Sequence, residues 1–186
     1  MKAILVGDRP VLAADSAILR TGEPLFIDGE ISDWRSVVAP GVKISRLGTN
    51  IHIDFANAYF DSMAMFHLLM PANPDMLPGD LWGMSDRSIS PGIFVELPLK
   101  GYADLQAGRN AATTRCQAPA LHKQRLGVPI TDHACRAIAD LSRSVTFKTG
   151  DILIFPDFAI DLESPVIDTI IEASINNIQS LHLKIK

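Results

Sequence analysis

VTFKTGDILIF at residues 145–155 and IDTIIEASINNIQSLHLKI at residues 167–185 are the two stretches that decide the fold of this chain. In the second stretch, apolar and polar side chains alternate on both sides of Asn176-Asn177, as they do along β-strands. Asparagine tolerates the left-handed backbone that a two-residue type I′ turn requires, so this stretch predicts a β-hairpin. In the first stretch, Gly150-Asp151 is a turn signal before a short apolar strand.

Upstream of these stretches, strand signals are frequent and helix signals are rare. Residues 59–70 are apolar on most sides and fit either a buried helix or a buried strand. Residues 71–92 are rich in proline and glycine, which is typical of a lid or a binding loop. One helix is predicted from its cap at Thr131-Asp132 through Ser144. Alternation or an apolar run predicts further strands at residues 3–6, 42–55, 93–99 and 102–107. The pattern of residues 42–55 is interrupted near Gly48-Thr49-Asn50, and a turn joins the last two strands.

The composition is that of an ordinary globular protein. The chain has 186 residues, of which 47% are apolar and 20% charged, and this size fits a single domain spanning residues 1–186. The formal net charge of −4 argues against nucleic acid or an anionic membrane as a partner. Cys116 and Cys135 lack CxxC spacing, which favours free thiols in a reducing compartment over a disulfide or a pair of metal ligands. Neither a signal-peptide core nor a membrane-spanning stretch is recognisable, so we expect a cytoplasmic protein.

The order of motifs in the C-terminal third is similar to that of a known superfamily. A predicted helix ends Leu141-Ser142-Arg143, a strand leads to the turn at Gly150-Asp151, and the hairpin of residues 167–181 follows. This order resembles the fumarylacetoacetate hydrolase superfamily, whose chains read LSR, then TLKxGDxIxTGTP, then DxVxVxIxGIGxLxxxV. Residues 27–35 resemble the VDSRIADWR segment of the 2-oxopentenoate hydratases in that superfamily, and residues 94–108 resemble their VxxNGxxxxxG strand pair. The resemblance implies an α+β fold, a β-rich mixed β-roll with few helices.

The resemblance also implies a metal site, and this sequence departs from it. In the family, a divalent cation is held by three carboxylates, two of them in a Glu-x-Glu pair on a strand that leads into an apolar run. If that run is residues 3–7 here, the pair falls at or before Met1. The third acid falls at Leu25, which cannot ligate a cation that prefers oxygen. The TGTP loop, which contacts substrate in the family, corresponds to Phe155–Phe158. We therefore expect no metal and no cofactor.

Five residues are candidates for catalysis. His52 and Asp54 would share one face of the predicted strand, where a His–carboxylate pair can act as a general base with its orienting partner. The alternative for this pair is two side chains that face solvent on an edge strand. The resemblance places Asp28, Glu30 and Arg35 at the floor of the family's pocket. The alternative for these three is an acidic turn paired with a nearby arginine.

Three further residues are candidates for substrate binding. Arg115 carries a planar guanidinium group, which can hold a carboxylate through two hydrogen bonds. Trp82 and Arg87 lie in the segment rich in proline and glycine, where a lid with an aromatic ring and an ion pair would close over a small acid. An ordinary surface loop is the alternative for the lid.

Two functions stay open on the sequence alone. The first, implied by the resemblance, is a metal-independent lyase, hydratase or cyclase that acts on a small 2-oxo acid or β-dicarbonyl substrate through an enolate. The second is a catalytically silent relative that serves as a partner subunit or binds a small molecule. A hot-dog-like acyl thioester dehydratase is a third possibility, and it would need a long central helix.

The sequence also bears on assembly. The resemblance implies a homodimer, or a heteromer with a related subunit. The runs Phe60–Met70 and Ile152–Phe155 are both apolar, and one chain has limited room to bury both. We therefore expect an apolar surface that marks an interface.

Overall fold

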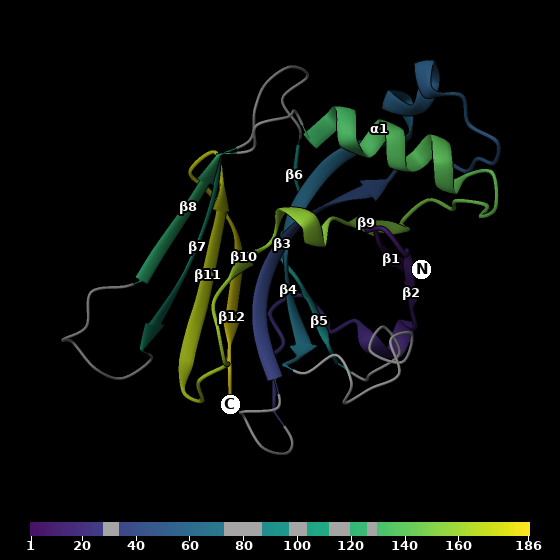
Figure 1. Cartoon of the computed structure of the whole chain (residues 1–186). Coiled ribbons are helices and arrows are strands. Elements are labelled where there is room, and N and C mark those ends of the chain that lie inside the picture. The colour runs from purple at the N-terminus through teal and green to yellow at the C-terminus, as the bar shows by residue number, and fades with distance from the viewer. Residues whose placement is uncertain (28–33, 73–86, 97–103, 112–119, 126–129) are drawn as a thin grey trace.

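The computed structural model describes residues 1–27, 34–72, 87–96, 104–111, 120–125 and 130–186. These residues form a larger and a smaller β-sheet with one α-helix (Figure 1). The larger sheet contains β1 (Ala3–Leu5), β2 (Val11–Ala13), β3 (Trp34–Ile44), β4 (Phe60–Pro71), β5 (Ile89–Pro91), β6 (Val95–Glu96), β9 (Ile152–Ile154) and β10 (Ile160–Asp161). The smaller sheet contains β7 (Asp104–Ala111), β8 (Ala120–Arg125), β11 (Thr169–Ile175) and β12 (Ile178–Lys184). The helices are α1 (Ile130–Leu141) and the 3-10 turns η1 (Asp15–Ala17), η3 (Ile53–Tyr59) and η6 (Pro156–Phe158).

The long antiparallel pair β3–β4 lies in the interior of the larger sheet. β9 pairs antiparallel with β3 and parallel with β1, which makes the sheet mixed. A Cβ atom on Gly41 of β3 would lie 2.6 Å from the carbonyl oxygen of Leu153 and 2.8 Å from the ring of Phe66. Since no real Cβ atom approaches its neighbours so closely, glycine at this position lets β9 and the Phe66 ring pack against β3.

The C-terminal hairpin confirms the turn prediction. Asn176 and Asn177 join β11 to β12 with positive φ angles of 51° and 64°, as the two central residues of a type I′ turn require. The side chains of Ile171, Ala173 and Ile175 on β11 are buried, and the intervening residues are only partly buried. β11 also pairs with β7, so the hairpin becomes half of the smaller sheet, in the order β12-β11-β7-β8.

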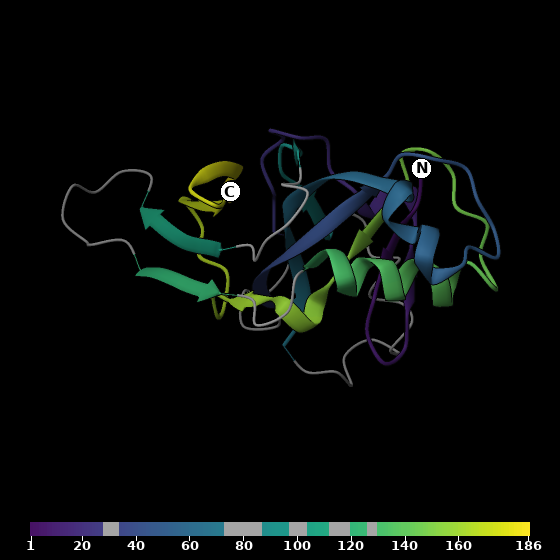
Figure 2. The same cartoon turned by 90° about the horizontal axis from the view of Figure 1, so that it is seen from above.

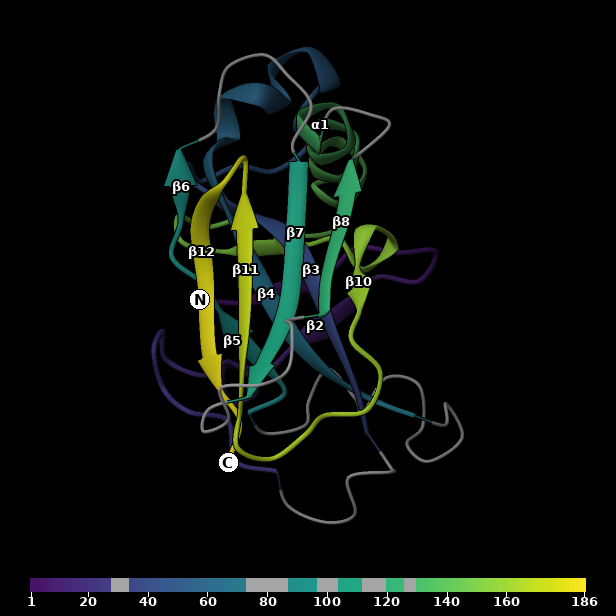
Figure 3. The same ribbon diagram turned by 90° about the vertical axis from the view of Figure 1, so that its left-hand side faces the viewer.

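The main hydrophobic core lies between the two sheets, which face each other in Figure 3. Inward side chains of β3, β4, β7, β11 and β12 meet there, and one face of α1 joins them. A second core cluster, which includes Leu5, Phe66 and Ile154, lies on the opposite face of the larger sheet. Figures 1 and 2 show α1 over the larger sheet and the β7–β8 ribbon extending away on the other side of the molecule.

Helix α1 confirms the predicted helix, although it ends earlier than predicted, at Leu141. Its buried face carries Ile130, Ala134 and Ile138 at helical spacing. Beyond Leu141, the N–H groups of Arg143 and Ser144 donate to carbonyl oxygens three residues back, and the Leu141 carbonyl oxygen also accepts from the Val145 N–H group. The helix thus ends in a tighter last turn.

Two sequence predictions are wrong in part. The strand pattern over residues 42–55 holds only as far as Ile44, where β3 ends, and its second part is the 3-10 turn η3, which begins at Ile53. Residues 93–107 do not form a hairpin, because β6 pairs with β4 in the larger sheet while β7 pairs with β11 and β8 in the smaller one. The apolar run at residues 59–70 is the strand β4. Most of the predicted lid, residues 73–86, lies outside the described residues.

Both apolar runs named above are buried within a single chain. Phe60 is 7% exposed, Met65 and Phe66 are fully buried, and Ile152 is 3% exposed. One chain therefore has room to bury both runs, so the expectation that they leave an apolar surface for an interface is wrong. Large apolar side chains are exposed elsewhere, among them Leu12, Phe26, Leu47, Phe55, Ile93 and Ile178.

No helix among the described residues is long and apolar enough to cross a membrane.

Candidate functional site

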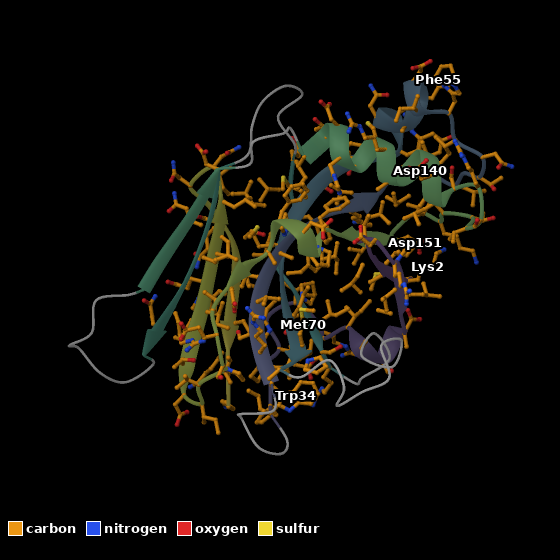
Figure 4. The ribbon with its side chains drawn as sticks, viewed as in Figure 1. Lys2, Trp34, Phe55, Met70, Asp140 and Asp151 are labelled. Carbon is orange, nitrogen blue, oxygen red and sulfur yellow. The ribbon has the colours of Figure 1, made fainter. Side chains whose placement is uncertain are left out.

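A surface cavity of about 470 Å³ lies where the segment that enters η3 meets the last turns of α1. The segment contributes Asn50, Ile51, His52 and Ile53 to the lining, and α1 with its C-terminal turn contributes Arg136, Ala139, Asp140 and Arg143. Figure 4 labels Phe55 and Asp140, which mark this end of the molecule. The cavity therefore combines one imidazole and two guanidinium groups with a carboxylate.

The charged lining residues share one face of the helix. Arg136, Asp140 and Arg143 follow each other at spacings of four and three residues, so their side chains project from the same side. All three are exposed, while Ile138 and Ala134 on the other side of the helix are buried. The charged face therefore remains available to a ligand while the apolar face anchors the helix.

Ser142 fixes the position of the segment that carries His52. The buried Ser142 hydroxyl oxygen accepts a hydrogen bond from the Ile51 N–H group at 2.8 Å, and the Ser142 carbonyl oxygen accepts one from the Asn50 N–H group at 2.8 Å. Asn50 has a positive φ of 48°, a left-handed conformation that asparagine tolerates. The chain therefore turns sharply at Asn50 and brings His52 to the cavity.

His52 and Asp54 lie side by side, though on η3 and its N-cap rather than on a strand. The Asp54 backbone N–H group donates to Nδ1 of His52 at 3.3 Å, and Nδ1 lies 3.2 Å from Oδ2 of Asp54. In the neutral ring this hydrogen bond puts the lone pair on Nδ1 and the proton on Nε2, whereas a proton on Nδ1 would face the Asp54 carboxylate and leave Nε2 as the acceptor. The two side chains are 67% and 76% exposed, so solvent reaches the pair.

The other predicted residues that the structure describes lie elsewhere. Arg35 forms an exposed ion pair with Asp161, and it follows Trp34, which Figure 4 places at the end of the molecule away from Asp140. Hydrogen bonding to Asp161 raises the pKa of Arg35. Arg87 forms an ion pair with Glu23, and its N–H group donates to the Ser16 carbonyl oxygen. Neither arginine lines the cavity.

The remaining predicted residues, Asp28, Glu30, Trp82 and Arg115, lie outside the described residues, and so does Cys116. Cys135 is a free, half-buried thiol on α1, and burial raises its pKa.

The described residues do not fit the metal site that the fold family implies. They contain no group of three or more His, Cys, Asp or Glu side chains that could hold a metal ion. Leu25, at the position of the third family carboxylate, is 1% exposed and packs in the main core. The rings of Phe155 and Phe158, at the position of the family's substrate loop, lie 5.1 and 4.8 Å from the ring of His133. Burial lowers the pKa of His133. Hydrocarbon and a single imidazole do not form a site for a hard cation.

Sequence reasoning missed Arg136, Asp140, Arg143 and Ser142. The first three carry a usable signal, since charges at helical spacing on an otherwise apolar helix define one polar face. Nothing in the sequence shows that this face meets the segment at residues 50–53, because that contact depends on the tertiary fold.

No protein-family model matches the sequence, and no curated protein matches it. Solved structures do match the fold. A fumarylacetoacetate hydrolase family protein from Yersinia pestis superposes with a TM-score of 0.73 at 15% identity, over 100% of this chain and 92% of that one. The 5-carboxymethyl-2-hydroxymuconate delta-isomerase from Mycobacterium smegmatis gives a TM-score of 0.73 at 13% identity, over 99% and 78%. Maleylpyruvate hydrolase from a Sphingobium species, in complex with manganese(II) and pyruvate, gives 0.76 at 14% identity, over 99% and 69%.

The class defined by this architecture is a β-rich α+β fold with a curled mixed sheet and few helices. More particularly, the chain has the fumarylacetoacetate hydrolase fold, which confirms the fold expected from the motifs of its C-terminal third. A hot-dog fold is thereby excluded, and the short helix α1 is not wrapped by a sheet (Figure 1).

Proposed function

We propose that the protein binds a small 2-oxo acid or β-dicarbonyl acid in the cavity beside α1 and acts on it through an enolate. The reaction class is that of a metal-independent lyase, hydratase or cyclase. The observation that carries this proposal is the meeting of the His52–Asp54 pair with Arg136 and Arg143 at one cavity. Enolate chemistry requires a group that moves the proton and cationic groups that stabilise the negative charge of the enolate.

The two guanidinium groups of the lining suit a small acid. With the Asp140 carboxylate they leave one excess positive charge in the lining, and the Asp54 carboxylate beside His52 is outside it. A guanidinium fork holds a carboxylate through two parallel hydrogen bonds, and the same positive field stabilises negative charge that develops on the neighbouring carbonyl oxygen.

His52 is the proton carrier in this proposal. Its Nε2 atom would take the proton from the carbon next to the carbonyl group, and the Asp54 carboxylate would stabilise the imidazolium that forms. This role requires the tautomer with the proton on Nδ1 facing Oδ2 of Asp54, in place of the hydrogen bond that the Asp54 N–H group donates to Nδ1.

The fold neighbours support the substrate class without identifying the substrate. Those neighbours include a delta-isomerase for 5-carboxymethyl-2-hydroxymuconate and a maleylpyruvate hydrolase whose structure contains pyruvate. The metal of that hydrolase has no counterpart among the described residues here, so no step is assigned to a metal.

A catalytically silent relative that only binds such an acid is the second candidate. The observation in its favour is the high exposure of His52 and Asp54, since water competes with substrate for the proton of an open imidazole.

Deuterium exchange into the methyl group of pyruvate, followed by proton NMR in D₂O, tests the proposal directly. Enolate formation removes the methyl signal, and we expect His52→Ala to slow the exchange by about 10²-fold, the scale of a lost general base. Arg136→Gln and Arg143→Gln should weaken pyruvate binding. Treatment with EDTA should leave the rate unchanged, because no metal takes part.

Arg20→Gln, which alters an exposed arginine outside the cavity, is the matched control and should retain the wild-type rate. Saturable binding of pyruvate without exchange would contradict the proposed enzymatic activity. It would support the second candidate, a relative that binds the acid without acting on it. Exchange at the wild-type rate in His52→Ala would remove His52 from the mechanism.

A further inference from the structure

A group of buried polar side chains lies between the two sheets, apart from the cavity beside α1. Ser36 on β3 and His67 on β4 are fully buried, and Ser90 on β5 is 3% exposed. His67 and Ser90 stand directly opposite each other in the β4–β5 pair, so their side chains are on the same face of the larger sheet. Arg109 on β7 faces this layer from the smaller sheet, since it alternates in register with the buried Leu105. Figure 3 shows β7 in front of β3 and β4.

The segment that follows β10 connects the Arg109 side chain to the strand that carries Ser36. The Ser36 N–H group donates to the Glu163 carbonyl oxygen at 2.7 Å, and the Leu162 N–H group donates to the Ser36 carbonyl oxygen at 2.9 Å. Nη2 of Arg109 donates to the carbonyl oxygens of Leu162 and Ser164. The guanidinium group is therefore held at the segment that follows β10, next to Ser36.

The Ser36–His67 contact links the tautomer of the imidazole to the direction of one hydrogen bond. The Ser36 hydroxyl oxygen lies 2.7 Å from Nε2 of His67, and within the described residues this is the one partner that the hydroxyl group has. The ring is neutral, because burial and the positive charge of Arg109 lower the pKa of His67 to about 3. If the hydroxyl proton is donated to Nε2, the single ring proton is on Nδ1, and Nδ1–H becomes a donor.

Three buried atoms of this group have no hydrogen-bond partner in the part of the chain that the structure describes. They are Nδ1 of His67, Oγ of Ser90 and Nε of Arg109. Buried polar atoms in proteins are normally paired, so three of them gathered in one layer call for a partner of their own. Each of the three can donate a hydrogen, and the one formal charge among them is positive.

We propose that this group is an internal binding site for a small carboxylate anion, held by Nδ1–H of His67, the Ser90 hydroxyl group and Nε–H of Arg109. Acceptor oxygens on the ligand would satisfy all three donors, and its negative charge would face the half-buried guanidinium group. Glu163 is the acid whose charge acts on Arg109, and its side chain is exposed. The ligand would therefore be the anion on the buried side of the guanidinium group. The surrounding layer is the packed main core, which restricts the ligand to about the size of formate or acetate.

Formate titrated into the full chain, labelled with ¹⁵N at histidine, tests this site independently of the cavity beside α1. We expect a saturable shift of the Nδ1–H resonance of His67 and a rise in Tm. Ser90→Ala should weaken formate binding by about fivefold or more, as loss of one hydrogen bond implies. Arg109→Lys, which keeps the charge but not the Nε donor, should weaken it further.

Ser174→Ala, a serine on the outer face of the smaller sheet, is the matched control and should bind formate as the wild type does. Arg136→Gln should also leave the His67 response unchanged, because Arg136 belongs to the cavity beside α1. A His67 resonance that does not move at tens of millimolar formate would overturn the proposal. An affinity unchanged in both Ser90→Ala and Arg109→Lys would overturn it as well. Failure of pyruvate exchange at the cavity bears on neither outcome.

Discussion

At the scale of single residues, the carboxylate of Asp151, in the turn before β9, contacts both Lys2 and Lys148. Its carboxylate is 2% exposed, lies 2.7 Å from Nζ of Lys2, and accepts backbone hydrogen bonds from Lys2 at 3.1 Å and Lys148 at 2.7 Å. Figure 4 shows Lys2 and Asp151 next to each other. Burial alone would raise the pKa of Asp151, but these contacts prevail and lower it. The aspartate of the Gly-Asp motif therefore joins the N-terminal strand to the turn.

We predict that Asp151→Asn lowers the free energy of unfolding by about 2–3 kcal/mol, because Lys2 loses the charge that faces it and one charged hydrogen bond becomes neutral. Urea denaturation at neutral pH measures this. The exposed Asp8→Asn is the matched control and should change the free energy by less than about 0.5 kcal/mol. Equal stability of Asp151→Asn and wild type would show that the contacts contribute nothing.

His67 makes stability depend on pH. Its pKa is about 3 in the folded chain and roughly 6.5 in an unfolded one, so below pH 6.5 the unfolded chain binds a proton that the folded chain does not. The free energy of unfolding should therefore fall as pH falls from about 6.5 toward 3, by up to about 1.4 kcal/mol for each pH unit. Urea denaturation at a series of pH values measures the slope. His67→Asn should flatten it and the exposed His182→Gln should not, whereas equal slopes in all three proteins would contradict the prediction.

At the scale of elements, the contact between α1 and the segment before η3 builds the cavity. We predict that Ser142→Ala lowers the free energy of unfolding by about 1–3 kcal/mol, because the Ile51 N–H group loses its acceptor at a buried position. Hydrogen exchange of the Ile51 amide should accelerate at the same time. A global loss of stability would instead accelerate exchange in all segments. The exposed Ser144→Ala is the matched control. An unchanged Ile51 amide would show that Ser142 does not hold the segment.

The elements that the sequence predicts correctly are those whose signal is local. The Asn176-Asn177 turn, the strand β1 and the helix α1 each follow from neighbouring residues. The predicted hairpin at residues 93–107 fails because β6 and β7 find partners far away in the chain. The same reason explains the site. His52 and Asp54 are close in sequence and are close in space, whereas Arg136 and Arg143 join them only through the fold.

At the scale of the whole molecule, we propose that the protein forms a homodimer. Exposed apolar side chains beside β12 offer a surface for it. Ile93 is 65% exposed and Ile178 is 53% exposed, and the Ile93 N–H group donates to the Ser180 carbonyl oxygen of that strand. A closed two-fold contact would bury such a patch against itself.

Light scattering at micromolar concentration should give twice the chain mass of 20.2 kDa. Ile178→Glu should shift the mass toward the monomer, and Leu47→Glu, at an exposed apolar side chain on another part of the surface, should not. A wild-type mass near that of a single chain would contradict the homodimer. Co-purification of a related second chain from the native source then tests the heteromer.

The position of β1 between β2 and β9 has a consequence for biosynthesis. Ala3 pairs with Ile152 and Leu5 pairs with Ile154, so this strand leaves the ribosome long before its parallel partner is translated. At typical synthesis rates the delay is on the order of 10–30 seconds, far longer than local structure needs to form. During that time the apolar strand has only its neighbour β2 to pair with. The larger sheet can therefore close only late in translation or after release, and the nascent N-terminal half is the part of the chain that chaperones would have to protect.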